Sequence, residues 1–162
     1  YGLNHVPDGV PHSSGGYLYQ DDDGCYWLNP ASQGTLSFLT QIIVELRNLG
    51  FDEVVFTDFC LPDDDSIVFN SDPVAAITEA AQLLVDTCAT ESFWVSFTGS
   101  SAFPLPTGNA RLYLENVAAA DVQFVVEQVG SEDPSKHILF YATGHDTRFD
   151  EYCVLRPLNM AQ

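Results

Sequence analysis

The chain has 162 residues, with 5 Lys and Arg against 23 Asp and Glu, which gives a formal net charge of −18. This length predicts a single domain, and a hydrophobic content of 46% lets it bury a sizeable core. The negative charge repels nucleic acid and anionic membranes, which we therefore exclude as partners, whereas a neutral sugar is not repelled. No apolar run approaches the roughly 18 residues that span a bilayer, so we expect no membrane insertion.

We expect residues 1–30 to form a loop followed by a β-hairpin. Residues 1–16 are rich in Gly, Pro, Asn and Ser. The short runs 17–20 and 25–28 then flank an Asp-Asp-Asp-Gly turn, and its Asp-Gly step supplies the positive φ angles that tight hairpins need. The aspartates lack the alternating spacing of a calcium loop, which favours a solvated turn. We expect this hairpin to lie over a sheet rather than within it.

Three helices are expected. Residues 34–49 carry Leu and Ile at spacings of three and four, and Gly50 ends the pattern. Asp72 and Pro73 are typical of the N-cap and first position of a second helix. A third stripe of Ala and Val covers residues 118–129, where the valines also suit a strand. Residues 130–136 are expected to form a loop.

Core strands are expected between these helices, at residues 53–57, 92–98, 111–115 and 137–144, with one last short strand at 152–157. A strand that is apolar on both sides is typical of a parallel sheet. The alternation of strands and helices predicts an α/β domain with a parallel sheet of βαβ units. Two arrangements stay open: the latter part of a (β/α)8 barrel, or an open doubly wound sheet.

Functional residues in such sheets gather at the carboxyl ends of the strands. Asp58 and Glu115 follow or end two predicted strands, and sugar hydrolysis needs two carboxyl groups flanking a glycosidic bond. Two strand spacings of about 4.8 Å place their backbones roughly 10 Å apart. We therefore predict Asp58 and Glu115 as catalytic residues. The structural alternatives are a turn role for Asp58, and for Glu115 a helix cap or a partner of Arg111.

Five further side chains are expected to bind substrate at the same strand ends, the aromatic ones by stacking on sugar rings: Phe59, Tyr113, Tyr141, His145 and Asp146. Trp94 lies in mid-strand and is expected in the core.

The cysteines and histidines show no spacing suited to zinc, so we expect neither a metal nor a cofactor. Cys88 lies on a helix face with aliphatic neighbours and is expected in the core. Cys60 and Cys153 approach each other only if their strands are neighbours.

Two motifs carry a resemblance to a known family. Trp27-Leu28-Asn29-Pro30 precedes a helix, and the strand Gly50-Phe51-Asp52-Glu53-Val54-Val55-Phe56-Thr57-Asp58 is followed by Pro62. This pattern, over roughly residues 25–62, resembles glycoside hydrolases with a (β/α)8 barrel. The resemblance implies that this strand is the fourth of the barrel and that its terminal acid, here Asp58, belongs to the active site. Thr57 occupies the position where the family has its more regular aspartate.

We therefore expect residues 1–162 to be a single domain, and a piece of a longer protein, that cleaves glycosidic bonds in an oligosaccharide or polysaccharide. The alternative is a non-catalytic carbohydrate-binding or structural domain of a larger surface protein, and Thr57 favours the binding form. If the barrel resemblance holds, the sheet is to be completed by a missing N-terminal half or by a second copy of this chain. The acidity suits an extracellular or cell-surface location.

Overall fold

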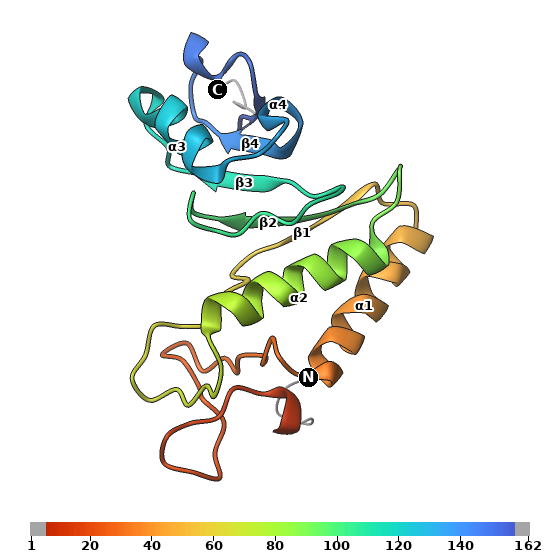
Figure 1. The fold of residues 1–162 in the computed structure, drawn as a ribbon, viewed down its shortest axis with the longest axis vertical. Helices are drawn as coiled ribbons and strands as arrows, with labels where there is room; N and C mark the ends of the chain where they lie inside the picture. Colours follow the sequence, from red (N-terminus) through yellow and green to blue (C-terminus); the bar gives the residue numbers. More distant parts are fainter. Residues whose placement is uncertain (1–5, 158–162) are drawn as a thin grey trace, which may run out of the picture.

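The computed structural model describes residues 6–157, and its centre is a five-stranded parallel sheet (Figure 1). The strands are β1 (Glu53–Phe56), β2 (Trp94–Gly99), β3 (Leu112–Glu115), β4 (Ile138–Tyr141) and β5 (Cys153–Leu155). They lie side by side in the order β1-β2-β3-β4-β5, and every neighbouring pair is parallel. The predicted α/β fold with βαβ units is confirmed, and the predicted last strand is part of the sheet.

The two long helices begin where their capping residues predict. The Ser32 hydroxyl accepts a hydrogen bond from Gly34 N at the start of α1 (Gln33–Asn48). The Asp72 carboxylate accepts from Val74 N and Ala75 N at the start of α2 (Pro73–Cys88), whose first residue is the expected proline. The bounds of α1 agree with the prediction to within one residue, and α2 begins at the predicted proline.

The second half of the chain holds shorter helices. Residues 118–129 are helical rather than extended, as the 3-10 turn η2 (Ala119–Asp121) followed by α3 (Val122–Val129). The expected loop before β4 contains one further helical turn, α4 (Pro134–His137). A single turn is too short to show an apolar stripe, which is why the sequence pattern missed it. Two more 3-10 turns, η1 (Val6–Asp8) and η3 (Thr147–Phe149), lie near the ends of the described chain.

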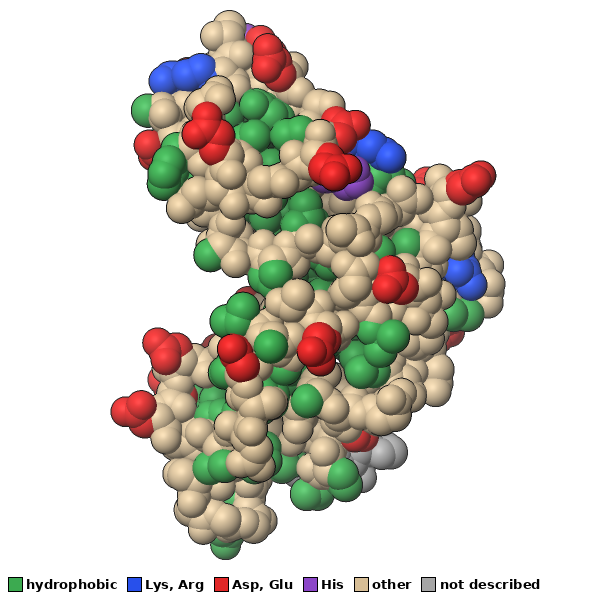
Figure 2. Space-filling view, in the orientation of Figure 1, with side chains coloured by type: hydrophobic (Ala, Val, Ile, Leu, Met, Phe, Trp, Pro, Cys, Tyr) green, Lys and Arg blue, Asp and Glu red, His purple; other side chains and the backbone are tan. Residues whose placement is uncertain are grey.

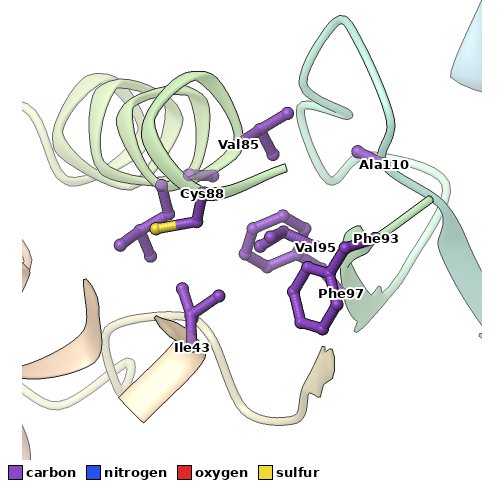
Figure 3. Packing of buried hydrophobic residues seen from close by; sticks show 9 residues of the cluster. Ile43, Val85, Cys88, Phe93, Val95, Phe97 and Ala110 are labelled. Atoms are coloured by element: carbon purple, nitrogen blue, oxygen red, sulfur yellow. The ribbon is translucent and has the colours of Figure 1, made fainter. Parts of the chain in front are cut away.

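The register of the strands places the buried core on one face of the sheet. Val54 pairs with Val95, Phe97 with Leu112, and Phe140 with Val154. Directly paired residues point to the same side, so the clusters under α1, α2 and α3 lie on a common face. Figure 3 shows part of this core, where Val85 and Cys88 of α2 and Ile43 of α1 surround Val95 and Phe97. The buried position predicted for Cys88 is confirmed.

Strand order also bears on the two arrangements left open by the sequence. Consecutive strands are neighbours without any reversal, and β1 lies at one edge, which is the position expected if these were consecutive strands of a barrel. The sheet is nevertheless open among the described residues, since β1 and β5 form its two edges. Cys60 follows β1 and Cys153 begins β5, so these two cysteines belong to opposite edges.

The opposite face of the sheet carries a polar cluster at the amino ends of the strands. The Glu53 carboxylate accepts hydrogen bonds from Ser96 Oγ at 2.5 Å, Arg111 Nη1 at 3.0 Å and Tyr113 OH at 2.9 Å. The Arg111 guanidinium lies 4.0 Å from the centre of the Trp94 ring. Trp94 is half-buried on this face, so the expectation that it belongs to the core is wrong. Its mid-strand position could not show which face it takes.

The N-terminal segment turns back on itself as a hairpin closed by one isolated bridge, without the two short strands that the sequence predicts. Gln20 and Tyr26 form an antiparallel bridge, and Gly24 adopts a φ of 80° in the turn between them. Gly9 and Pro11 pair with the outer sides of the same hairpin, at Leu28 and Leu18. None of these residues belongs to the five-stranded sheet. The part of the expected N-terminal loop at residues 1–5 lies outside the described residues.

Candidate functional site

Asp58 lies just beyond the carboxyl end of β1, in an unusual backbone conformation. Its φ is 54°, in the left-handed region that few residues other than Gly, Asn and Asp adopt. The side chain is exposed and makes no ion pair with any residue between 6 and 157. Asp58 lines two hollows, one of about 420 Å³ and one of about 570 Å³. Asp58 thus lies beyond the end of a strand, as the sequence predicts, and borders two hollows.

The 420 Å³ hollow lies between the ends of β1 and β2 and the start of α2. Its floor is formed by Phe59 and Phe103, whose rings lie 5.0 and 5.3 Å from that of Phe97 in the core. Gly99 and Ser100 form the wall on the side of β3. Phe59 thus lines the hollow and also packs against Phe97 in the core.

Glu115 is the last residue of β3 and is exposed. It lines two hollows of about 260 and 370 Å³, and Gly99 and Ser100 line the first of these as well as the hollow of Asp58. Asp58 and Glu115 therefore line separate hollows that both border the segment Gly99-Ser100. One strand, β2, lies between β1 and β3, so their backbones are two strand spacings apart, about 10 Å. Arg111 pairs with Glu53, not with Glu115.

The four hollows follow one another along the carboxyl ends of β1 to β4, and we call this series of neighbouring hollows the rim groove. Each hollow shares lining residues with the next: Asp58 and Phe59 join the first two, Gly99 and Ser100 the next pair, and Glu115 and Asn116 the last. The strands point toward the left in Figure 1, and Figure 2 shows a deep indentation on that side.

Tyr141, His145 and Asp146 line the 370 Å³ hollow together with Glu115, as the sequence predicts. His145 Nε2 lies 3.3 Å from a carboxylate oxygen of Asp150. Asp146 accepts three hydrogen bonds from Arg148, and those from the guanidinium hold the pKa of this carboxyl well below its usual range. Asp146 is therefore an anion that caps η3 and shapes the end of the groove.

Tyr113 is predicted to bind substrate, but the fold places it away from the rim groove. It points to the face opposite the helices, its hydroxyl donates to Glu53, and it lines none of the four hollows. Burial is the main cause that raises its pKa, and the hydrogen bond to the Glu53 carboxylate adds to it. Tyr113 stabilises the sheet at its amino end.

Two aromatic residues of the hairpin, Tyr26 and Trp27, line the 570 Å³ hollow at the other end of the groove. The Trp27 indole N–H donates to Asp21 at 2.9 Å, which fixes the ring. The sequence predicts the hairpin but does not indicate that either residue lies beside the predicted site. Only the docking of the hairpin beside β1 reveals their role.

Among residues 6–157 the structure contains no cluster of His, Cys, Asp and Glu arranged to hold a metal ion. None of the helices in this part of the chain is long and apolar enough to cross a membrane. Comparisons with known protein families, with curated proteins and with solved structures found no match to this chain.

Proposed function

We propose that this domain binds a carbohydrate along the rim groove and cleaves a glycosidic bond between Asp58 and Glu115. One observation supports the proposal: two exposed acidic residues at the carboxyl ends of β1 and β3 line hollows that share Gly99 and Ser100. Glycoside hydrolysis needs such a pair, one group to protonate the departing oxygen and the other to act as base or nucleophile.

The composition of the groove supports a carbohydrate over other ligands. Exposed aromatic side chains, Tyr26 at one end and Tyr141 at the other, offer apolar ring faces to the CH faces of sugar rings. The groove also contains Asp58, Glu115 and Asp146, and the whole chain carries a charge of −18. Anionic ligands are repelled by these charges, which favours a neutral or cationic sugar. An extracellular or cell-surface location fits such a ligand.

A second function, binding without cleavage, is favoured by the exposure of both carboxylates. A general acid at neutral pH needs surroundings that keep it protonated, such as an apolar pocket or a neighbouring anion. Asp58 and Glu115 are both open to solvent, and Thr57 lies beside Asp58 where the resembling family has an aspartate. Substrate that covers the groove and excludes water is required for hydrolysis.

The test compares the parent protein with Asp58→Asn and Glu115→Gln on chromogenic glycosides, soluble polysaccharides and a glycan array. Asp63→Asn is the matched control, because Asp63 is an exposed acid in the following loop and lines none of the four hollows. We expect hydrolysis to fall at least a hundredfold in both site variants and to stay unchanged in the control, with unfolding free energies within about 0.5 kcal/mol of the parent.

Three outcomes are informative. Array binding that Asp58→Asn abolishes, with no turnover by the parent, establishes the binding function instead. Full hydrolytic activity in either site variant contradicts the assignment of that carboxylate. A parent protein that neither binds nor cleaves any glycan overturns the proposal as a whole.

A further inference from the structure

We propose that the glycosides bound here carry an apolar aglycone, and that the 570 Å³ hollow is the subsite that receives it. This inference rests on the proposed carbohydrate function and specifies its substrate class. The hollow, which we call the aglycone hollow, lies between the N-terminal hairpin, α1, the end of β1 and α2.

The lining of the aglycone hollow is mostly aliphatic and aromatic. Leu36 and Leu39 come from α1, and Ile77 and Ala80 from α2, while the hairpin and the end of β1 add four aromatic residues: Tyr26, Trp27, Phe56 and Phe59. Its volume of about 570 Å³ falls within the range of roughly 300–1,000 Å³ typical of sites for small organic molecules. Such a space suits an aromatic or alkyl group.

Two polar side chains of the lining, those of Thr35 and Asp21, already have partners within the protein. Thr35 Oγ1 donates to the Asp8 carbonyl oxygen at 3.1 Å. The Asp21 carboxylate accepts from Trp27 Nε1 and from the backbone of Cys25 and Asp23, and these bonds lower its pKa. A second sugar ring placed against the apolar walls, near Thr35 and Asp21, would bury hydroxyl groups without partners, which costs free energy. An apolar aglycone avoids this cost, and this difference selects it over a longer oligosaccharide.

The walls of the hollow are fixed before any ligand arrives. Leu36, Leu39 and Phe56 pack against the buried core under α1 and α2. On the opposite side the hydrogen bond to Asp21 holds the Trp27 ring in place. A preformed hollow does not have to be ordered on binding, so burying an apolar group in it contributes fully to affinity.

Asp58 lies where the aglycone hollow meets the 420 Å³ hollow, since it lines both. With the aglycone in the first and the sugar in the second, the glycosidic oxygen comes next to Asp58. Asp58, in its protonated form, donates its proton to that oxygen as the bond to the anomeric carbon breaks. Water adds to the anomeric carbon from the far side, and the Glu115 carboxylate takes the proton that this water loses. Proton exchange with solvent then returns both carboxyl groups to their starting forms. The products are the free sugar and the aglycone alcohol.

The binding test uses the full chain and a neutral fluorescent probe, N-phenyl-1-naphthylamine, displaced by octyl and by methyl glycosides below the micelle concentration. We expect the parent to bind the probe, and octyl glycosides to displace it at concentrations at least tenfold lower than methyl glycosides. Thr57→Trp and Leu36→Trp fill the hollow from two sides, and each should weaken probe binding at least tenfold. Leu83→Trp is the control, because Leu83 is an exposed residue of α2 outside the hollow.

The cysteines provide a second readout that needs no substitution. Cys25 and Cys60 are exposed thiols that line the aglycone hollow, whereas Cys153 lies in β5. Octyl glycoside should slow alkylation of Cys25 and Cys60 by a maleimide at least threefold and leave Cys153 unaffected.

These measurements separate the two proposals. Octyl-glycoside binding and thiol protection without any cleavage support the aglycone hollow and contradict the hydrolase. Cleavage or binding that is equal for methyl and octyl glycosides, or probe binding unchanged in a folded Thr57→Trp variant, overturns the aglycone hollow and leaves the hydrolase intact.

Discussion

The two acidic residues at the ends of β1 have opposite surroundings. Glu53 opens the strand, and its carboxylate accepts hydrogen bonds from Ser96, Arg111 and Tyr113. Asp58 follows the strand, is exposed, and forms no ion pair within residues 6–157. The hydrogen-bonded Glu53 stabilises the amino end of the sheet, whereas the exposed Asp58 suits the ligand site that we propose at the carboxyl end, where such sites usually lie in parallel α/β sheets.

Substitution of Glu53 tests this division at a single side chain. Glu53→Ala removes the acceptor of three hydrogen bonds. One of them belongs to the ion pair with Arg111, in which the Arg111 and Glu53 side chains are only 24% and 20% exposed. We therefore expect a loss of about 1–3 kcal/mol in unfolding free energy. Glu45→Ala, at an exposed position of α1, should change it by less than about 0.5 kcal/mol. Denaturant titration measures both, and equal stability of the two variants would show that the cluster does not stabilise the sheet.

The N-terminal hairpin contributes aromatic residues to the lining of the aglycone hollow. It holds Tyr26 and Trp27 over the aglycone hollow, and its own geometry depends on Asp21. The Asp21 carboxylate accepts hydrogen bonds from the Cys25 backbone, the Trp27 indole and the Asp23 backbone, and these bonds hold its pKa below the ordinary value. Only the ionised form accepts them all.

This linkage predicts a pH-dependent hairpin. A carboxyl whose pKa is lowered in the folded state stabilises it at pH values above the unfolded pKa of about 3.9, and this stabilisation is lost as the pH falls through the lower folded value. Asp21→Asn should therefore be less stable than the parent at pH 7, and the difference should shrink steadily below about pH 4. Trp27 fluorescence and thermal unfolding follow the change, and Asp22→Asn is the control. A constant difference across this pH range would refute the linkage.

At the scale of the molecule, the sheet is sequential, open at β1 and β5, and packed by helices through one face. The other face holds half-buried residues such as Val55 and Thr98 and the exposed Tyr141. Pairing of these edges or this face with a second copy or with another part of a longer protein stays a prediction.

Hydrogen exchange tests the strand order directly. Amides of β2 and β3 lie between neighbours on both sides and should exchange slowest, while β5, a three-residue strand at one edge, should exchange fastest. Exchange of β1 should also be faster than that of β2. Protection of β1 equal to that of β2 and β3 would mean that β1 lies inside the sheet rather than at its edge.

Local signals in the sequence determined the elements of this protein. The cap formed by Asp72 and Pro73, the stripe of α1 and the apolar runs of the strands are all read from residues a few positions apart, and the structure reproduces them. The position of the candidate carboxylates could also be predicted from the sequence, because a residue that follows a parallel strand must lie at the carboxyl edge of its sheet.

Only the tertiary structure decided which side each residue takes and what it meets there. Trp94 and Tyr113 point away from the helices because the strand register places them on the polar face with Glu53 and Arg111. Tyr26 and Trp27 belong to the groove because the hairpin docks beside α1 and β1. These placements depend on contacts between residues far apart in the chain, and no pattern within a single segment records them.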